Sequence, residues 1–269
     1  MSEKPEKSPH PGARRFLPWI IPSLFLLLWI FVSHGGLVPT FLMPHPLDIA
    51  ETGYTYIFGS SGEGPYAGRF LSDAGSSLLR VGVGFAVAVA VGLPLGILSG
   101  RLLTIQQLMS TTVNALRAVP GITWLPLAMV WFGIGLKTTV FLVAMAAFFP
   151  VYLNAAAGAR QVHPLLLQAG AMMGVRRLRG TFAILLPAAM PNLMTGLRLG
   201  LGISWAYLVL GELTGVPNGL GAVIMDARML GRIDMIVVGI ILIAVMGRLT
   251  DRLLQTGMRL CFKSARRGV

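Results

Sequence analysis

The chain has 269 residues, of which 55% are hydrophobic and only 12% are charged, and its formal net charge is +12. So many apolar residues with so few charges cannot cover a soluble surface, and the composition indicates a membrane protein. The basic excess does not indicate nucleic-acid binding, because the arginines fall between apolar runs rather than together on one face. The single cysteine, Cys261, cannot form an internal disulfide and has no metal-ligating residues spaced around it.

The N-terminal region divides into a tail, an apolar run and a loop. Residues 1–15 mix Pro, Ser and charge, so we expect a cytoplasmic tail. The 17 residues from Phe16 to Val32 carry no charge, and no small-residue cleavage site follows, which predicts an uncleaved first transmembrane helix over 16–38. Residues 39–77 are rich in proline and glycine and hold four acids against one arginine, Arg69, which predicts a periplasmic loop.

The remaining apolar runs predict five further transmembrane helices within residues 78–257, followed by a cytoplasmic tail over 258–269. The expected fold is therefore all-α and polytopic, with about six transmembrane helices. Gly92, Gly96 and Gly100 recur at four-residue spacing in the first of the five, which either permits close approach of a neighbouring helix or reflects a glycine-rich composition. The runs that predict the five spans are 81–98, 112–136, 138–159, 191–213 and 233–254.

Charge between the spans predicts the orientation. An even number of spans puts both termini on one side, and most lysines and arginines outside the spans fall on that side. The positive-inside rule then makes this side, and both termini, cytoplasmic. The largest basic loop, 160–187, lies between the fourth and fifth spans and contains no acid.

This basic loop contains the run QAGAMMGVRRLRGTFAILLP, residues 168–187. Proline at 164 suits a first helical position, and Gly174 suits a helix end, which predicts a short helix over 163–175. The spacing of Leu165, Leu166, Ala169, Met172 and Met173 gives it an apolar face. Two interpretations remain open: an interfacial helix whose arginines face lipid headgroups, and a docking helix that inserts into a groove of a partner protein.

The same run resembles the EAA loop of ABC importer permeases, E-A-A-x-x-x-G-(x9)-I-x-L-P. Ala169, Gly174 and the I-x-L-P ending match, whereas Gln168 and Gly170 depart from the expected Glu and Ala. The blocks at 116–135, 148–160, 198–213 and 219–228 also resemble permeases of the nitrate, sulfonate and taurine branch, in the family's order. The resemblance extends over roughly 75 to 260, nearly the whole transmembrane part.

This resemblance implies a type I ABC importer permease fold in the bacterial inner membrane. It also implies a homodimer of permeases, two cytoplasmic ATPase subunits, a periplasmic binding protein and a small anionic substrate. The chain contains no G-x-x-x-x-G-K-[ST], so the subunit is not expected to be an enzyme, and ATP and Mg²⁺ are expected on the ATPase. No catalytic residue, cofactor or metal ligand is expected in the chain. The residues that the resemblance assigns to ATPase coupling are Gln168, Ala169, Gly170, Met173, Gly174, Arg176, Arg177 and Pro187.

Polar residues within the predicted spans are candidates for a solute pathway. Glu212, at the outer end of the fifth span, either contacts the binding protein or holds the adjoining loop. Arg117 and Arg198 are placed toward the cytoplasmic ends of their spans, where snorkelling or pairing explains them. An ion-driven secondary transporter remains the alternative, although no acid falls well inside a predicted span; a membrane-embedded enzyme would need paired catalytic groups. The pathway candidates are Trp124, Asn154, Ser204, Trp205 and Tyr207.

Overall fold

A computed structural model describes residues 13–35, 39, 42–60 and 62–261. Its described part is helical and contains no strand. The elements in chain order are α1 (Ala13–His34), α2 (Pro46–Phe58), α3 (Phe70–Arg101), α4 (Leu103–Ala118), η1 (Gly121–Trp124), α5 (Leu125–Phe132), α6 (Leu136–Gln161), α7 (Pro164–Met172), α8 (Arg177–Gly180), η2 (Thr181–Leu185), α9 (Leu186–Glu212), α10 (Leu220–Met229) and α11 (Ile233–Cys261).

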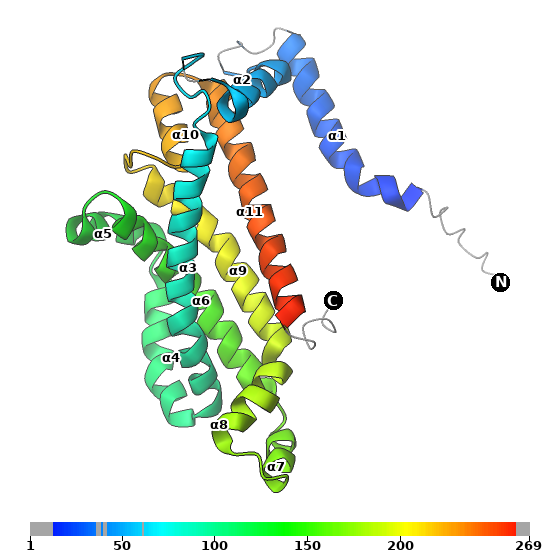
Figure 1. The fold of residues 1–269 in the computed structure, drawn as a ribbon, viewed down its shortest axis with the longest axis vertical. Coiled ribbons are helices and arrows are strands. Elements are labelled where there is room, and N and C mark those ends of the chain that lie inside the picture. Colours follow the sequence, from blue (N-terminus) through cyan, green and yellow to red (C-terminus); the bar gives the residue numbers. More distant parts are fainter. Residues whose placement is uncertain (1–12, 36–38, 40–41, 61, 262–269) are drawn as a thin grey trace, which may run out of the picture.

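The long helices run lengthwise through an elongated bundle (Figure 1). Helices α7 and α8 lie at one end, called here the α7 end, and α2 and α10 lie at the other, called the α10 end. Helix α6 packs against both α3 and α9 over most of its length. Two apolar clusters form the core: one near the α10 end, which includes Trp205 and Leu208, and one near the α7 end, which includes Leu185 and Met190.

Four of the described helices are long and apolar enough to cross a membrane: Phe70–Arg101, Leu136–Gln161, Thr181–Glu212 and Ile233–Leu260. They correspond to the predicted second, fourth, fifth and sixth spans. The predicted third span is not one straight helix, because α4 and the η1–α5 segment meet at a bend of 88°. Pro120 and Val119 interrupt the helix there, since proline lacks an amide donor and disfavours helical geometry in the residue before it. The first predicted span corresponds to a shorter apolar helix, Trp19–His34.

Two predicted boundaries differ from the structure. The segment 39–77 is not a loop throughout, because it contains α2 and the first turns of α3. Its proline at 46 occupies the first turn of α2, where the missing amide hydrogen is not needed. Helix α3 begins at Phe70, well before the predicted start of the second span. Its first turns can be buried although they are polar, because Asp73 accepts a hydrogen bond from Tyr56 and Arg80 pairs with Glu212.

The glycine stripe on α3 permits close packing against α6. A Cβ atom at Gly96 would lie 2.5 Å from the Tyr152 carbonyl oxygen, and one at Gly100 would lie 2.5 Å from the Ala156 carbonyl oxygen. Both obstacles are backbone atoms, which cannot move aside without moving α6. The stripe is therefore a helix-packing feature, as small residues are in membrane bundles.

Candidate functional site

The short helix predicted in the basic loop is present as α7. His163 precedes it in an extended conformation, and its ring nitrogen Nδ1 accepts a hydrogen bond from the Leu165 amide at 3.3 Å. Pro164 occupies the first helical position, where a missing amide hydrogen leaves no bond unmade. Local sequence thus sets where α7 begins.

Gly174 ends α7 in the conformation that the sequence predicts. Its φ angle is +80°, in the left-handed region that glycine adopts without steric strain. The Val175 amide donates to the Gly170 carbonyl at 2.9 Å, and the Gly174 amide donates to the Ala171 carbonyl at 3.0 Å. This pair of bonds is a Schellman motif, which satisfies the last helical carbonyls and turns the chain sharply.

Helix α7 exposes most of its apolar residues. Met172 is 85% exposed and Met173 is 77% exposed, and Leu165 and Leu166 are also exposed. Gln168 and Ala169 lie on the exposed surface as well, whereas Gly170 is buried. Contiguous apolar side chains on a surface usually mark a contact with another protein or with lipid.

Ile184, the first residue of the I-x-L-P ending, contacts α7 in this chain. A Cβ atom at Gly170 would lie 2.3 Å from Ile184 Cδ1, so the isoleucine side chain packs directly on the helix backbone. The nine residues between Gly174 and Ile184 form the turn, α8 and most of the π-helical η2, which returns the chain to α7. Gly170, which departs from the family's alanine, therefore accommodates this contact. Pro187 lies in the first turn of α9, immediately after this return.

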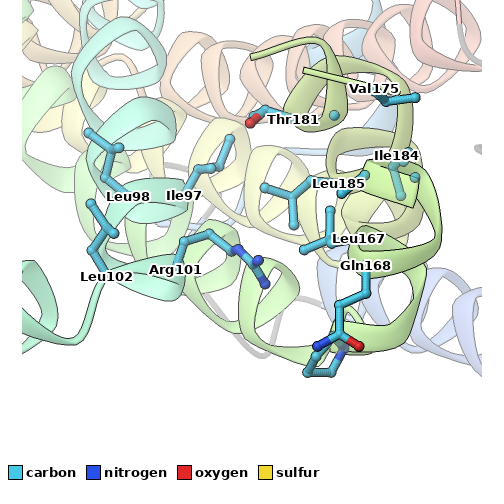
Figure 2. A pocket seen from close by; sticks show the side chains of 14 residues that line it. Ile97, Leu98, Arg101, Leu102, Leu167, Gln168, Val175, Thr181, Ile184 and Leu185 are labelled. Atoms are coloured by element: carbon cyan, nitrogen blue, oxygen red, sulfur yellow. The ribbon is translucent and has the colours of Figure 1, made fainter. Parts of the chain in front are cut away.

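A cavity of about 710 Å³ separates α7 and η2 from the end of α3 (Figure 2). The Arg101 side chain extends into it from α3, and Gln168 lies on the opposite wall. Most other lining residues are apolar, including Leu98 and Leu185. Arg176 and Arg179 are exposed beyond α7, whereas the side chain of Arg177 lies outside the described residues.

A second cavity, of about 500 Å³, lies between α4, α6 and α9, and we call it the central cavity. Asn154 and Tyr207, two of the five pathway candidates, line it. Ser204 is buried and donates to the Gly200 carbonyl at 2.8 Å, and Trp205 is buried and donates from Nε1 to Thr250 Oγ1 at 3.0 Å. Trp124 is half-buried in η1 and does not line this cavity. The structure therefore brings together two candidates and separates three from them.

Arg117 does not lie where the sequence placed it. It is in the last turn of α4, away from the α7 end where that helix begins, and it lines the central cavity. The predicted third span starts near Arg117, whereas α4 starts at Leu103. The apolar-run criterion missed the first turns of α4 because they contain Gln106 and Gln107. Arg117 therefore lies almost a full helix length away from the α7 end.

Arg198 has the pairing that the sequence analysis considered. Its Nε donates to Asp251 Oδ1 at 3.0 Å and its Nη2 donates to Asp251 Oδ2 at 3.2 Å. The two-pronged contact joins α9 to α11. The charge of Arg198 is therefore neutralised by Asp251, and the pair links α9 to α11.

Glu212 is buried at the α10 end, with 0% exposure. Its carboxylate accepts from Ser77 Oγ at 2.8 Å and from Arg80 Nη1 at 2.5 Å. The Gly221 amide donates to it at 2.8 Å. Of the two roles left open for Glu212, this geometry favours holding the adjoining loop, because the carboxylate is fully occupied within the chain.

Asp73 continues this polar cluster. Its carboxylate accepts from the Tyr56 hydroxyl at 3.0 Å and from the Gly219 amide at 3.1 Å. Burial and the adjacent Asp73 carboxylate raise the pKa of Tyr56 above its usual range, so the hydroxyl remains a donor. Sequence reasoning missed Asp73, Ser77 and Arg80, although their spacing of four and three residues would have placed them on one helix face.

A family model and several known permeases match this chain. Residues 92–256 match the family model described as "Binding-protein-dependent transport system inner membrane component". The chain is 33% identical over 245 residues to the putative aliphatic sulfonates transport permease of Bacillus subtilis, covering 90% of this chain and 86% of that protein. It is 30% identical over 229 residues to the taurine transport system permease of Escherichia coli, covering 85% and 82%. The nitrate import permease of Synechocystis is 28% identical over 260 residues, covering 93% and 92%.

A solved structure shares the fold. The chain superposes on the MetNI methionine ABC transporter in an inward-facing conformation with a TM-score of 0.57 and 21% sequence identity. The superposition covers 70% of this chain and 95% of that one. The helical arrangement is therefore that of an ABC importer permease.

Proposed function

The chain belongs to the binding-protein-dependent transport system inner membrane components, as a permease subunit of an ABC importer, and from this membership we propose that α7 couples it to a cytoplasmic ATPase. The observation that carries the proposal is the construction of α7. Its apolar residues are exposed, while the Schellman turn at Gly174 and the Ile184 contact hold the helix in place. A rigid, exposed, methionine-bearing helix suits insertion into a groove of a partner protein.

Two ATPase subunits and a second permease copy complete the proposed assembly, with a soluble binding protein at the opposite face. ATP and Mg²⁺ are bound by the ATPases, and this chain holds no cofactor. Closure of the ATPases on ATP moves the two α7 helices, and the long helices attached to them rock between inward-facing and outward-facing states. Gln168, Ala169, Gly170 and Met173 lie in or beside the contact, and Arg176, Arg177 and Arg179 meet acids at its rim.

The α7 end is cytoplasmic in this proposal, in a bacterial inner membrane. Arg101, Arg160, Arg176 and Arg179 lie at or next to that end, against Arg69, Arg228 and Arg232 near the other. This distribution has the sign of the positive-inside rule. The predicted positions of both termini in the cytoplasm stay predictions, because residues 1–12 and 262–269 lie outside the described residues.

The substrate is proposed to be a small solute of the sulfonate, taurine or nitrate class, carrying an anionic group. The support is the naming of three relatives that cover most of this chain, as permeases for aliphatic sulfonates, taurine and nitrate. The binding protein at the outer face would make the primary selection among such solutes. The central cavity offers a passage through the subunit pair, with Asn154 and Tyr207 on its wall.

Co-purification with the ATPase subunit, and stimulation of its ATP hydrolysis by the binding protein, test the proposal. Reconstituted vesicles should accumulate solute only when ATP is present on the α7 side. Uptake that follows an ion gradient in vesicles lacking the ATPase would establish the secondary-transporter alternative instead.

Met173→Gln is expected to weaken association with the ATPase by about tenfold. Burying a methionine side chain contributes about 1.5–3 kcal/mol, and the polar replacement loses most of that contribution. The dissociation constant of the purified permease and ATPase, measured in detergent, gives the result. Met229→Gln is the matched control, because Met229 is 76% exposed but lies on α10 at the opposite end. Equal weakening by both substitutions would remove α7 from the interface.

A further inference from the structure

Arg117 is exposed on the isolated subunit and lines the central cavity from α4. Helix α4 begins at Leu103 beside the α7 end, and Arg117 is in its last turn, about 21 Å farther along at 1.5 Å per residue. The side chains that share its cavity, including Phe149 and Ile203, come from the middle of α6 and of α9. The distance along α4 is a large part of the roughly 30 Å thickness of a bilayer core, so Arg117 is well separated from the α7 end of the subunit.

The charge of Arg117 is not neutralised within the described part of the chain. The described ion pairs join other arginines to Asp73, Glu212, Asp234 and Asp251, and none includes Arg117. No carboxylate lines the central cavity. Charged residues in the membrane-spanning part of a protein are rare, and those that persist usually face a water-filled cavity on a substrate or ion pathway.

The neighbouring polar groups also favour an anion. Asn154 uses one amide hydrogen to reach the Pro150 carbonyl at 2.8 Å, which leaves the second available. The Tyr207 hydroxyl forms no hydrogen bond with any other described residue and lies on the same wall. A guanidinium presents its donors in a planar fork that matches the oxygens of an oxyanion.

We propose that Arg117 is the residue of the translocation pathway that attracts the anionic group of the solute, with Asn154 and Tyr207 as its hydrogen-bonding neighbours. The inference rests on the proposed importer function and adds a named selectivity element within the permease. Contact with the anion is transient, because one arginine with two neutral donors binds an oxyanion weakly enough to release it. The cavity is open on the side of α9 where Leu199 and Ile203 are exposed, and a second permease copy closes it there.

A charged-reagent experiment measures this property without transport. In a Cys261→Ser background, Tyr207→Cys is treated in membranes with a sulfonate-bearing methanethiosulfonate and with its trimethylammonium counterpart. The ratio of the two reaction rates reports the local charge, and Arg117→Gln is expected to lower it by about tenfold, since the two probes differ by two unit charges. Arg117→Lys should retain the ratio. Arg228→Gln, an exposed arginine on α10, should also leave it unchanged.

An unchanged ratio in Arg117→Gln, or no reaction at position 207 with either reagent, overturns the proposal. Asn154→Cys provides a second reporter position on the same wall if Tyr207→Cys does not reach the membrane. Solute uptake then separates this inference from the importer function. Arg117→Gln should reduce uptake while ATP hydrolysis stimulated by the binding protein persists, whereas loss of both would make Arg117 a structural residue. Failure of the importer proposal itself would appear in the unsubstituted protein as the absence of stimulated hydrolysis.

Discussion

Gly174→Ala is expected to lower ATP hydrolysis stimulated by the binding protein by about tenfold while the permease still reaches the membrane. Gly174 has a φ angle of +80°, and a Cβ atom there would meet no other atom within 4 Å. The effect is therefore one of backbone strain, and a non-glycine residue in the left-handed region costs about 1–2 kcal/mol. Relief of this strain would open the Schellman turn and shift α7 from its docking position. A bulkier residue is expected to have at least this effect.

Gly180→Ala is the matched control for this prediction. Gly180 is in the same loop, but its φ angle is −63°, which alanine adopts without strain. A Cβ atom there would lie 3.8 Å from the nearest neighbour, Val175 Cγ1, which is an ordinary contact. Hydrolysis should therefore be nearly unchanged. If Gly174→Ala instead abolished membrane insertion, the turn would be required for folding rather than for coupling.

Glu212→Gln is expected to lower the free energy of unfolding by about 3–5 kcal/mol. Removing one partner of a buried ion pair leaves the other charge uncompensated in the interior. The Arg80 and Glu212 side chains are 9% and 0% exposed, and their closest nitrogen and oxygen atoms are 2.5 Å apart. The amide would also direct hydrogens at the donors that now point to the carboxylate, from Ser77, Arg80 and the Gly221 backbone. Thermal unfolding of the detergent-solubilised protein measures the effect.

Glu51→Gln provides the comparison, because Glu51 is exposed on α2 and its substitution should change stability by only a few tenths of a kcal/mol. The double substitution Arg80→Met and Glu212→Leu removes both charges and should recover part of the loss, as hydrophobic replacements of buried pairs often do. A double variant as unstable as the sum of its single substitutions would show that the two charges are not coupled.

Family membership and helical architecture could be predicted from the sequence. The I-x-L-P spacing after Gly174 and the blocks around Trp124 and Asn154 indicated an ABC importer permease, and the family match over residues 92–256 confirms it. The start and end of α7 were also predictable, because Pro164 and Gly174 act through their own backbone chemistry. The coupling role of α7 stays a prediction, since it concerns a partner.

The pathway residues were harder to select from the sequence. Ser204 and Trp205 lie within three residues of Tyr207 in the chain, yet they point into the bundle while Tyr207 faces the central cavity. The hydrophobic pattern of α9 cannot separate these faces, because a span surrounded by lipid and by other helices is apolar on all sides. Only packing against α6 and α11 distinguishes them.

The sequence by itself determined the class of protein, the chain positions of most spans and the local geometry of α7, because composition, apolar runs and the backbone preferences of proline and glycine act locally. Tertiary structure alone decided that Arg117 lines the central cavity and that Glu212 pairs with Arg80. Both depend on where α3 and α4 begin, and polar residues at those helix starts hide the boundaries from a hydropathy pattern. The place of Arg117 in the cavity and the partner of Glu212 follow from contacts between helices that are distant in the chain.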